Sequence, residues 1–301
     1  MIDLAILYEH PSWFAPLFEG LGRRELAYSA FGPNGHWNPA DPDVPAAVVF
    51  NRIAMSSFLR AQEHPIFHAT AMLDHWQRNG ARVINGADVM AIDSSKARQL
   101  ALLASLGLAI PETRVVHRVS DVETAAATLC FPLVVKANIG GSGAGIVKFD
   151  NMAEVRWAVS ERQLPVSVDG VLLVQEYVPA RGGTITRIET LDRSYLYAIE
   201  IAGAGAFDLC PADACIADSG IAMTSVHPSA ALIEASEAIA RAMNLDVGGI
   251  EVMIDDRDGV PRFYDINALS NFVANPLDVL GWDPHETLID YLATAISEAK
   301  G

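Results

Sequence analysis

The sequence has few cysteines and no long hydrophobic run. Its three cysteines, Cys130, Cys210 and Cys215, form no Cys-x-x-Cys pair, and an odd set without paired spacing is not a disulfide framework. No run reaches the roughly 18 to 20 apolar residues of a membrane-spanning helix. The first residues lack the basic and apolar segments of a signal peptide. We therefore expect a cytoplasmic protein with no membrane contact.

Basic residues are also scarce. The 301 residues include 21 Lys and Arg against 37 Asp and Glu, which gives a formal net charge of −16. A general nucleic-acid binder needs a surplus of cations to neutralise phosphates, so the composition argues against nucleic acid as a partner. A few local cations can still hold an anionic ligand. With 51% hydrophobic residues, the chain is not disordered, and its length indicates about two domains.

Several common catalytic motifs are absent. The eight histidines show no HExxH spacing, no GxSxG element supports a serine hydrolase, and no GxGxxG element indicates a dinucleotide fold. A Walker A loop is excluded because Ile146 stands where that motif requires lysine. Any nucleotide site must therefore be of another kind.

The pattern of apolar segments predicts two domains. In residues 1–92, strands at 4–8, 46–50 and 82–84 alternate with a helix at 69–80, which indicates a doubly wound parallel α/β domain. From residue 93 onwards, helices at 95–106 and 229–244 are mixed with strand pairs, as in an α+β domain. A further helix is expected from Ser120, because Glu123 gives it capping-box spacing. We place the domain boundary between residues 88 and 95.

A glycine-rich loop and a lysine form the first candidate site. Predicted strands at 133–136 and 145–149 flank a loop that contains Gly140, Gly141, Gly143 and Gly145. Glycine lets backbone amides approach an anion closely, so such a loop can cover phosphates. Lys136, directly before the loop, suits phosphate oxygens. A plain β-hairpin with a solvent-exposed lysine remains an alternative at this point.

Three oxygen-bearing side chains form the second candidate site. Asp265 and Asn267 are two residues apart on a predicted strand, so they share a face, and Glu251 lies on the preceding strand. Two carboxylates and an amide oxygen suit Mg²⁺. An Asp-x-Asn pair is also common at strand edges. The third candidate, residues 175–178, follows an apolar strand and could bind a planar base through its backbone.

Taken in order along the chain, these segments resemble the ATP-grasp superfamily, in its branch of RimK-like carboxylate–amine ligases. The resemblance covers residues 94–291 and rests on SSKARQLALLASLGLAIPET, FPLVVKANIGGSGAGIVKF, LLVQEYVPARGGTITRIE, GGIEVMI and YDINALSNF. It implies an N-terminal α/β domain at 1–92 and an ATP-grasp domain at 93–301. Within the latter, a small lid subdomain at about 110–180 and a C-terminal subdomain at 181–301 would hold the nucleotide between them.

The resemblance also implies a role for each site residue. Lys136 and Arg187 match catalytic positions, with Arg187 steadying an acyl phosphate. Glu251, Asp265 and Asn267 match magnesium ligands. The nucleotide-binding positions are Lys96, Lys136, Gly141, Ser142, Gly143, Ala144, Gln175, Glu176, Tyr177 and Val178.

The implied activity is ATP-dependent ligation of a small-molecule carboxylate to an amine, such as an amino acid or peptide, with ATP and Mg²⁺ or Mn²⁺ as cofactors. A homo-oligomer is compatible with the resemblance. Three departures leave the substrates open: Asp265 replaces the usual glutamate, residues 184–186 lack a ribose-binding carboxylate, and FDLCPADAC replaces an Arg/Asn motif. A kinase, an acid–thiol ligase and a non-catalytic ATP sensor remain alternatives.

Overall fold

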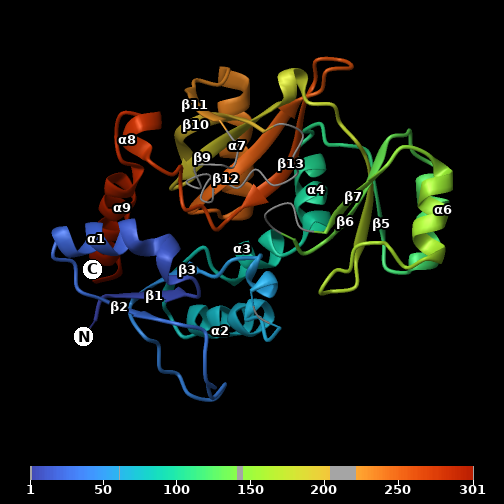
Figure 1. The fold of residues 1–301 in the computed structure, drawn as a ribbon. Coiled ribbons are helices and arrows are strands. Elements are labelled where there is room, and N and C mark those ends of the chain that lie inside the picture. The colour runs from blue at the N-terminus through green and yellow to red at the C-terminus, as the bar shows by residue number, and fades with distance from the viewer. Residues whose placement is uncertain (1, 61, 141–144, 204–221, 301) are drawn as a thin grey trace.

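Three β-sheets organise the chain (Figure 1). The computed structural model describes residues 2–60, 62–140, 145–203 and 222–300. We refer to the parts of the chain built on the sheets within residues 4–84, 113–176 and 184–267 as the N-terminal domain, the lid subdomain and the C-terminal subdomain. Within the described ranges, no helix is both long and apolar enough to cross a membrane.

The N-terminal domain is built on a four-stranded parallel sheet of order β2-β1-β3-β4. Its strands are β1 (Leu4–Tyr8), β2 (Tyr28–Phe31), β3 (Val48–Arg52) and β4 (Arg82–Ile84). Its helices are α1 (Ala15–Arg23), α2 (Ile66–Arg78) and α3 (Ala87–Asp93). The parallel α/β arrangement confirms the predicted fold class for this domain. In such a sheet the carboxyl ends of all strands lie at one edge, where ligands bind in related folds.

The lid subdomain is a four-stranded antiparallel sheet of order β5-β8-β6-β7. Its strands are β5 (Thr113–Val116), β6 (Leu133–Ala137), β7 (Ile146–Phe149) and β8 (Leu172–Glu176), with helices α5 (Val122–Ala126) and α6 (Met152–Ser160). The predicted capping box at Ser120 is wrong. Ser120 lies inside a 3₁₀ turn, Val119–Asp121, and its hydroxyl contacts Asp121 instead of a backbone N–H. Helix α5 therefore begins two residues later, without a side-chain cap.

The C-terminal subdomain is a five-stranded sheet of order β11-β10-β9-β12-β13, in which neighbouring strands are antiparallel. Its strands are β9 (Thr184–Leu191), β10 (Ser194–Ala202), β11 (Ala222–Val226), β12 (Val247–Ile254) and β13 (Pro261–Asn267). The associated helices are α4 (Lys96–Ser105), α7 (Ala230–Met243), α8 (Pro276–Val279) and α9 (Pro284–Lys300). Ser95 and Ser229 cap α4 and α7 by accepting backbone N–H groups, because a serine hydroxyl satisfies first-turn donors.

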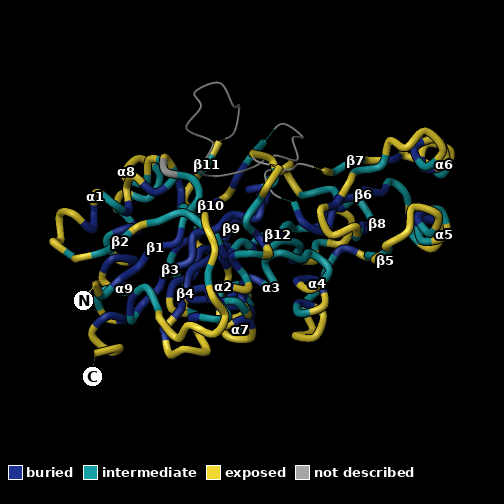
Figure 2. Tube along the Cα trace, turned by 90° about the horizontal axis from the view of Figure 1, so that it is seen from below, coloured by how far each residue is buried: buried dark blue, intermediate teal, exposed yellow. Residues whose placement is uncertain are grey.

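The C-terminal sheet lies between the other two sheets, with the lid subdomain at one end of the molecule and the N-terminal domain at the other (Figures 1 and 2). A single apolar core joins the N-terminal sheet to the C-terminal subdomain. It combines Leu4 and Ile6 of β1 with Ile199 of β10, Val247 of β12 and Leu288 of α9. The lid has a core of its own, between its sheet and helices α5 and α6.

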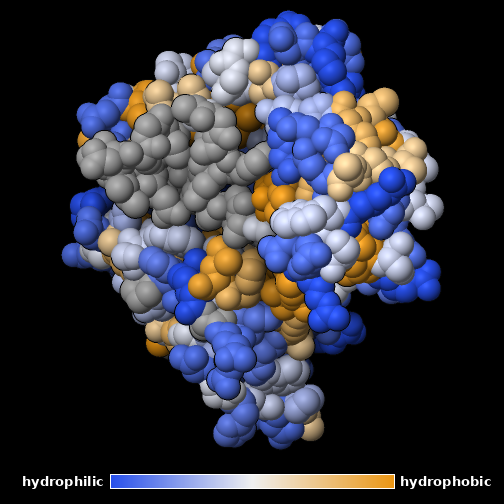
Figure 3. All heavy atoms as spheres, turned by 45° about the vertical axis from the view of Figure 1, so that its right-hand side comes forward, coloured by the Kyte–Doolittle hydropathy of each residue, from blue (hydrophilic) through white to orange (hydrophobic). Residues whose placement is uncertain are grey.

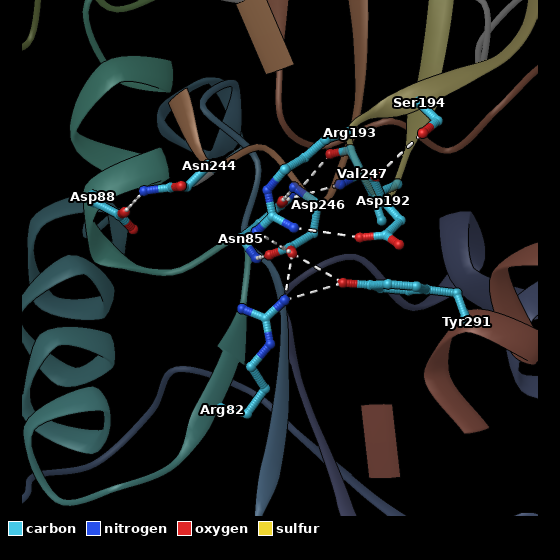
Figure 4. Close-up of polar contacts among 10 residues, drawn as sticks. All are labelled: Arg82, Asn85, Asp88, Asp192, Arg193, Ser194, Asn244, Asp246, Val247 and Tyr291. Atoms are coloured by element: carbon cyan, nitrogen blue, oxygen red, sulfur yellow. Dashed lines mark hydrogen bonds and ion pairs between the residues drawn. The ribbon is translucent and has the colours of Figure 1, made fainter. Parts of the chain in front are cut away.

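A buried aspartate, Asp246, links the N-terminal domain to the C-terminal subdomain (Figure 4). Asp246 is 1% exposed. Its Oδ1 accepts from Arg82 Nη2 at 2.6 Å, from Tyr291 Oη at 2.9 Å and from Arg193 Nη2 at 3.3 Å. Its Oδ2 accepts from the backbone N–H of Asn85 at 2.9 Å. Both oxygens of this carboxylate are therefore satisfied, by groups from β4, α9 and the β9–β10 turn.

Asn85 reinforces the same junction with its side chain. Its Oδ1 accepts from the backbone N–H groups of Asp246 and Val247, at 3.0 and 3.2 Å. Its Nδ2 donates to the carbonyls of Val247 and Ala268, both at 2.7 Å. The residue adopts a left-handed backbone with φ of 52°, a conformation that asparagine tolerates better than most residues. Through the hydrogen bond to Ala268, Asn85 contacts the residue that directly follows the predicted metal ligand Asn267.

Candidate functional site

A cavity of 280 Å³ lies between the lid sheet and the C-terminal sheet. Its lining includes the whole predicted segment from Gln175 to Val178, together with Lys136. Apolar side chains supply much of the rest: Val134, Ile146, Ile185 and Met253. Figure 3 shows apolar surface gathered towards the centre of one face, with hydrophilic side chains around its margin. An apolar slot with a few polar groups is suited to a planar ring.

The backbone of the 175–178 segment leaves one donor available to that cavity. The N–H of Glu176 donates to Glu112 and that of Tyr177 to Pro132, each at 2.9 Å. Val178 is 7% exposed, and its N–H has no acceptor among the described residues. A buried N–H is rarely left unpaired, so this group can bind a ligand acceptor. The position agrees with the predicted contact to a base.

The side chains of this segment are occupied by the protein itself. Glu176 accepts from the Cys130 N–H at 3.1 Å and from Arg257 at 3.4 Å. Gln175 donates to the Thr113 hydroxyl at 2.7 Å. These contacts hold the end of β8 in place, so its backbone rather than its side chains faces a ligand.

Lys136 lies on β6 at the wall of the cavity and is 5% exposed. Its ammonium makes no hydrogen bond or ion pair with any described residue. The pKa of Lys136 is lowered to about 7, chiefly by burial and also by the nearby charge of Lys96, while Asp265 and Glu251 oppose the shift. A buried ammonium without a partner is costly, so this side chain is suited to an anionic ligand.

The three predicted metal ligands lie together. Strands β12 and β13 place Glu251 opposite Asp265, and Gly249 opposite Asn267. Asn267 Nδ2 is 3.3 Å from Glu251 Oε1, and Lys96 Nζ contacts Asp265 Oδ1. Burial raises the pKa of Glu251, and the charge of Asp265 raises it further. Two adjacent, partly buried carboxylates favour a nearby positive charge, and Arg187 and Lys96 already supply part of it.

The donor chemistry of this set fits Mg²⁺. No three His, Cys, Asp or Glu side chains gather as metal ligands in the described part of the chain. The side-chain amide of Asn267, which lies beside Glu251, is a further oxygen donor next to the two carboxylates. Two carboxylate oxygens and one amide oxygen are hard donors, and Mg²⁺ commonly completes its shell with water and phosphate oxygens.

Arg187 lies on β9 beside the carboxylates and is 6% exposed. Its Nε donates to Glu189 at 2.6 Å, its Nη1 to Glu251 at 3.1 Å, and its Nη2 to the Ser270 hydroxyl at 3.4 Å. These hydrogen bonds hold the guanidinium in place next to the predicted metal ligands. This geometry brings the predicted catalytic arginine into the same site as the predicted metal ligands.

Two residues that the sequence did not indicate also belong to this site. Asp93 accepts from the Ala268 N–H at 3.1 Å. Burial raises the pKa of Asp93 to about 7, and the nearby charge of Asp265 also raises it. Tyr264 hydrogen-bonds Glu251, and burial raises its pKa well above 10. Tyr264 opens the quoted segment YDINALSNF but was given no role, and Asp93 lies just before the first quoted segment, so only the hydrogen-bond partners reveal their place.

Part of the predicted site lies outside the described residues. Gly141, Ser142, Gly143 and Ala144 of the glycine loop fall there, and so do Cys210 and Cys215. Gly145, which follows the loop, has a left-handed φ of 71°, and a Cβ there would lie 3.2 Å from the Ala137 Cβ. A glycine is therefore required where the loop enters β7.

Comparisons with known proteins identify the family of the chain. Residues 93–275 match the model of the RimK-like ATP-grasp domain. A probable alpha-L-glutamate ligase of Thioalkalivibrio sulfidiphilus is 33% identical over 40% of each chain. The ribosomal protein bS6–L-glutamate ligase of Shigella boydii is 29% identical over 67% of this chain and 64% of its own. The chain thus spans less than two thirds of the length of these two relatives.

The fold also resembles a solved structure. The ATP-grasp ligase PsnB, complexed with a minimal precursor, superposes with a TM-score of 0.71 at 18% identity. This match covers 98% of the present chain and 100% of PsnB. The family-model match covers more than half of the sequence and contains every predicted site residue. The chain belongs to the RimK-like ATP-grasp family.

Proposed function

We propose that the protein is an ATP-dependent carboxylate–amine ligase that works through an acyl phosphate. The observation that carries this proposal is Lys136, a buried ammonium without a described partner that lines a base-sized cavity. The positive charge of Lys136 also interacts electrostatically with Glu251 and Asp265. A nucleotide triphosphate has the planar base, the polyanion and the metal affinity that this arrangement requires.

The proposed reaction has two steps. A carboxylate oxygen attacks the γ-phosphorus of ATP, the bond to the β,γ-bridging oxygen breaks, and ADP leaves. An amine nitrogen then attacks the acyl carbon, inorganic phosphate leaves, and the nitrogen loses a proton. Catalysis of phosphoryl transfer depends mainly on positioning and charge stabilisation. Lys136 and Lys96 would supply positive charge to the phosphates, and Arg187 would stabilise the charge that develops on the acyl phosphate.

Glu251, Asp265 and Asn267 would hold a divalent cation, which when bound would neutralise phosphate charge. Mn²⁺ accepts the same oxygen donors as Mg²⁺, so we propose that it can substitute. The Val178 N–H would bind the base, and the glycine loop would cover the phosphates. The carboxylate and the amine are proposed to be an amino acid, a peptide or a related small molecule. The relatives named as glutamate ligases and the precursor-bound PsnB support this class.

The test is release of ADP and inorganic phosphate from Mg-ATP, with pooled amino acids and pooled carboxylates added separately and together. Wild type should release both products only when both pools are present. Lys136→Met should lose at least about a hundredfold in rate, because one buried charge contact to phosphate is worth roughly 3 kcal/mol. Lys300→Met is the matched control, since Lys300 is exposed and pairs with Asp3 on another face.

Each result separates the candidate functions. A stable phosphorylated product without free phosphate would identify a kinase and overturn the proposal. Tight Mg-ATP binding without turnover in any mixture would identify a sensor. Full turnover by Lys136→Met would show that the nucleotide site lies elsewhere.

A further inference from the structure

Gln99 is a buried side chain near the N-terminus of α4, and it is 1% exposed. Its Oε1 accepts from the backbone N–H of Ile266 at 3.0 Å, and its Nε2 donates to the carbonyl of the same residue at 2.9 Å. Nε2 also donates to the Asp93 carbonyl at 3.1 Å. Both amide hydrogens and one oxygen lone pair are thus in use, so the hydrogen bonds fix the orientation of the side-chain amide.

These hydrogen bonds meet β13 between two predicted metal ligands, because Ile266 lies between Asp265 and Asn267. β13 is the last strand in the order of its sheet, so in the described part of the chain one side of its backbone has no neighbouring strand. The N–H and C=O of one residue point to the same side of a strand, and those of Ile266 point towards α4. Gln99 therefore pairs with the free edge of β13 as a further strand would.

Asp93 holds the same edge one residue past the end of β13. Its Oδ1 accepts from the backbone N–H of Ala268 at 3.1 Å, and alternate residues present their N–H groups on one side of a strand. The backbone on both sides of Asn267 is therefore held by side chains from the end of α3 and the start of α4.

The side chain of Ile266 anchors the same residue from another direction. It is 1% exposed and belongs to an apolar core that also contains Leu100 and Leu103 of α4. Successive side chains of a strand alternate between its two faces, so Asp265 and Asn267 leave the opposite face. With its side chain in the core and its N–H and C=O hydrogen-bonded, Ile266 cannot rotate about the strand axis. Such a rotation would turn both neighbouring side chains away from Glu251.

Helix α4 also contacts Asp265 directly. Lys96 lies three residues before Gln99, so the two side chains share one face of the helix, and Lys96 Nζ forms an ion pair with Asp265 Oδ1. One helix face therefore places a positive charge beside a predicted metal ligand and holds the backbone of the next residue. A change at Gln99 should act first on Asp265 and Asn267.

We propose that Gln99 is a positioning residue for the divalent cation of the nucleotide site, because by fixing the backbone of Ile266 it sets the directions of Asp265 and Asn267. This inference rests on the proposed function, in which those two side chains hold the cation. Gln99 itself touches neither the cation nor the nucleotide. Groups that orient metal ligands in this way commonly contribute about 10- to 100-fold to metal affinity.

The experiment is a calorimetric titration of a non-hydrolysable ATP analogue, with and without Mn²⁺, into wild type and Gln99→Met. Methionine is similar to glutamine in length and helix propensity but removes all three hydrogen bonds. In wild type, Mn²⁺ should tighten binding of the analogue. Gln99→Met should lose about tenfold or more of that tightening, while it binds the metal-free analogue as wild type does. Gln99→Glu keeps the acceptor for the Ile266 N–H and should lose less.

Leu73→Ala is the control that separates positioning from a loss of stability alone. Leu73 of α2 is fully buried in the core of the N-terminal domain, so Leu73→Ala should lower Tm at least as far as Gln99→Met and leave the Mn²⁺ effect unchanged. If Gln99→Met retains the full Mn²⁺ effect, or if Leu73→Ala loses it to the same extent, the positioning role is overturned while the proposed function stands. If wild type shows no Mn²⁺ effect, the metal assignment in the proposed function fails, and this inference fails with it.

Discussion

Replacing Asp246 by alanine should weaken the junction between the N-terminal and C-terminal parts of the protein. The carboxylate is 2% exposed and receives hydrogen bonds from Arg82, Arg193, Tyr291 and the Asn85 N–H. Removing it leaves these donors without their acceptor. Breaking a buried ion pair from one side costs about 3–5 kcal/mol.

The expected magnitude follows from the exposure of the partners. The side chains of Arg82 and Arg193 are 42% and 31% exposed, so water can solvate both guanidinium groups after the substitution. Most of the loss then comes from Tyr291 and the Asn85 N–H, since an unsatisfied donor costs about 1–3 kcal/mol. We expect Asp246→Ala to lower the free energy of unfolding by about 3 kcal/mol.

Urea unfolding followed by circular dichroism measures this loss, and Asp192→Ala is the matched control. Asp192 belongs to the same cluster and pairs with Arg193 at 3.3 Å, but its side chain is 62% exposed. An exposed pair contributes about 0–1 kcal/mol, so the control should lose less than about 1 kcal/mol. If Asp246→Ala also loses less than this amount, or if both variants lose the same amount, the reasoning from burial is refuted.

Three further predictions concern the nucleotide and metal site. Mg-ATP binding at pH 8 should take up protons, because the triphosphate favours the charged form of Lys136, whose pKa is about 7 in the free protein. Calorimetry in two buffers measures this proton uptake, and Lys136→Met should abolish it. Glu251→Gln should weaken Mg-ATP binding at least tenfold while metal-free ATP binds as well or better, and equal losses with and without Mg²⁺ would exclude Glu251 as a ligand. Asp93 has a pKa of about 7 in the folded protein, above its ordinary value of 3.8, so the native state retains a proton that the unfolded chain has lost and stability should fall as pH rises from about 4 to 7. Asp93→Asn should reduce that slope in a series of Tm measurements, and an unchanged slope would contradict the assignment.

The sequence was sufficient for site residues that lie close together along the chain. Glu251 and Asp265 belong to two strands joined by the short Asp258-Gly259 turn, and such a hairpin fixes which residues face each other. Lys136 was likewise predicted as a candidate phosphate-binding residue from the glycine loop that follows it. The helix at 95–106 was predicted because its apolar face and the glycine that ends it, Gly107, lie in one continuous segment.

Residues whose partners are distant in sequence could not be predicted. Asp93 meets Ala268, and Asp246 meets Arg82 and Asn85, only after the N-terminal domain has packed against the C-terminal subdomain. An isolated aspartate gives no sign of such a partner. The Ser120 capping box failed for a local reason, since the spacing is correct but the chain closes a 3₁₀ turn at that point. Spacing alone does not distinguish these two backbone paths.

The shared apolar core has a consequence for how the protein can be divided. The family match ends at residue 275 and begins at residue 93, yet Leu4 and Ile6 pack with Val247 and Leu288. Cutting the chain at those limits would divide this core among the resulting pieces and expose its apolar surface. We therefore expect that the segment 93–275 does not fold stably by itself. Recombination or truncation at its borders should yield aggregates, whereas exchange of the lid, which has its own core, should be tolerated.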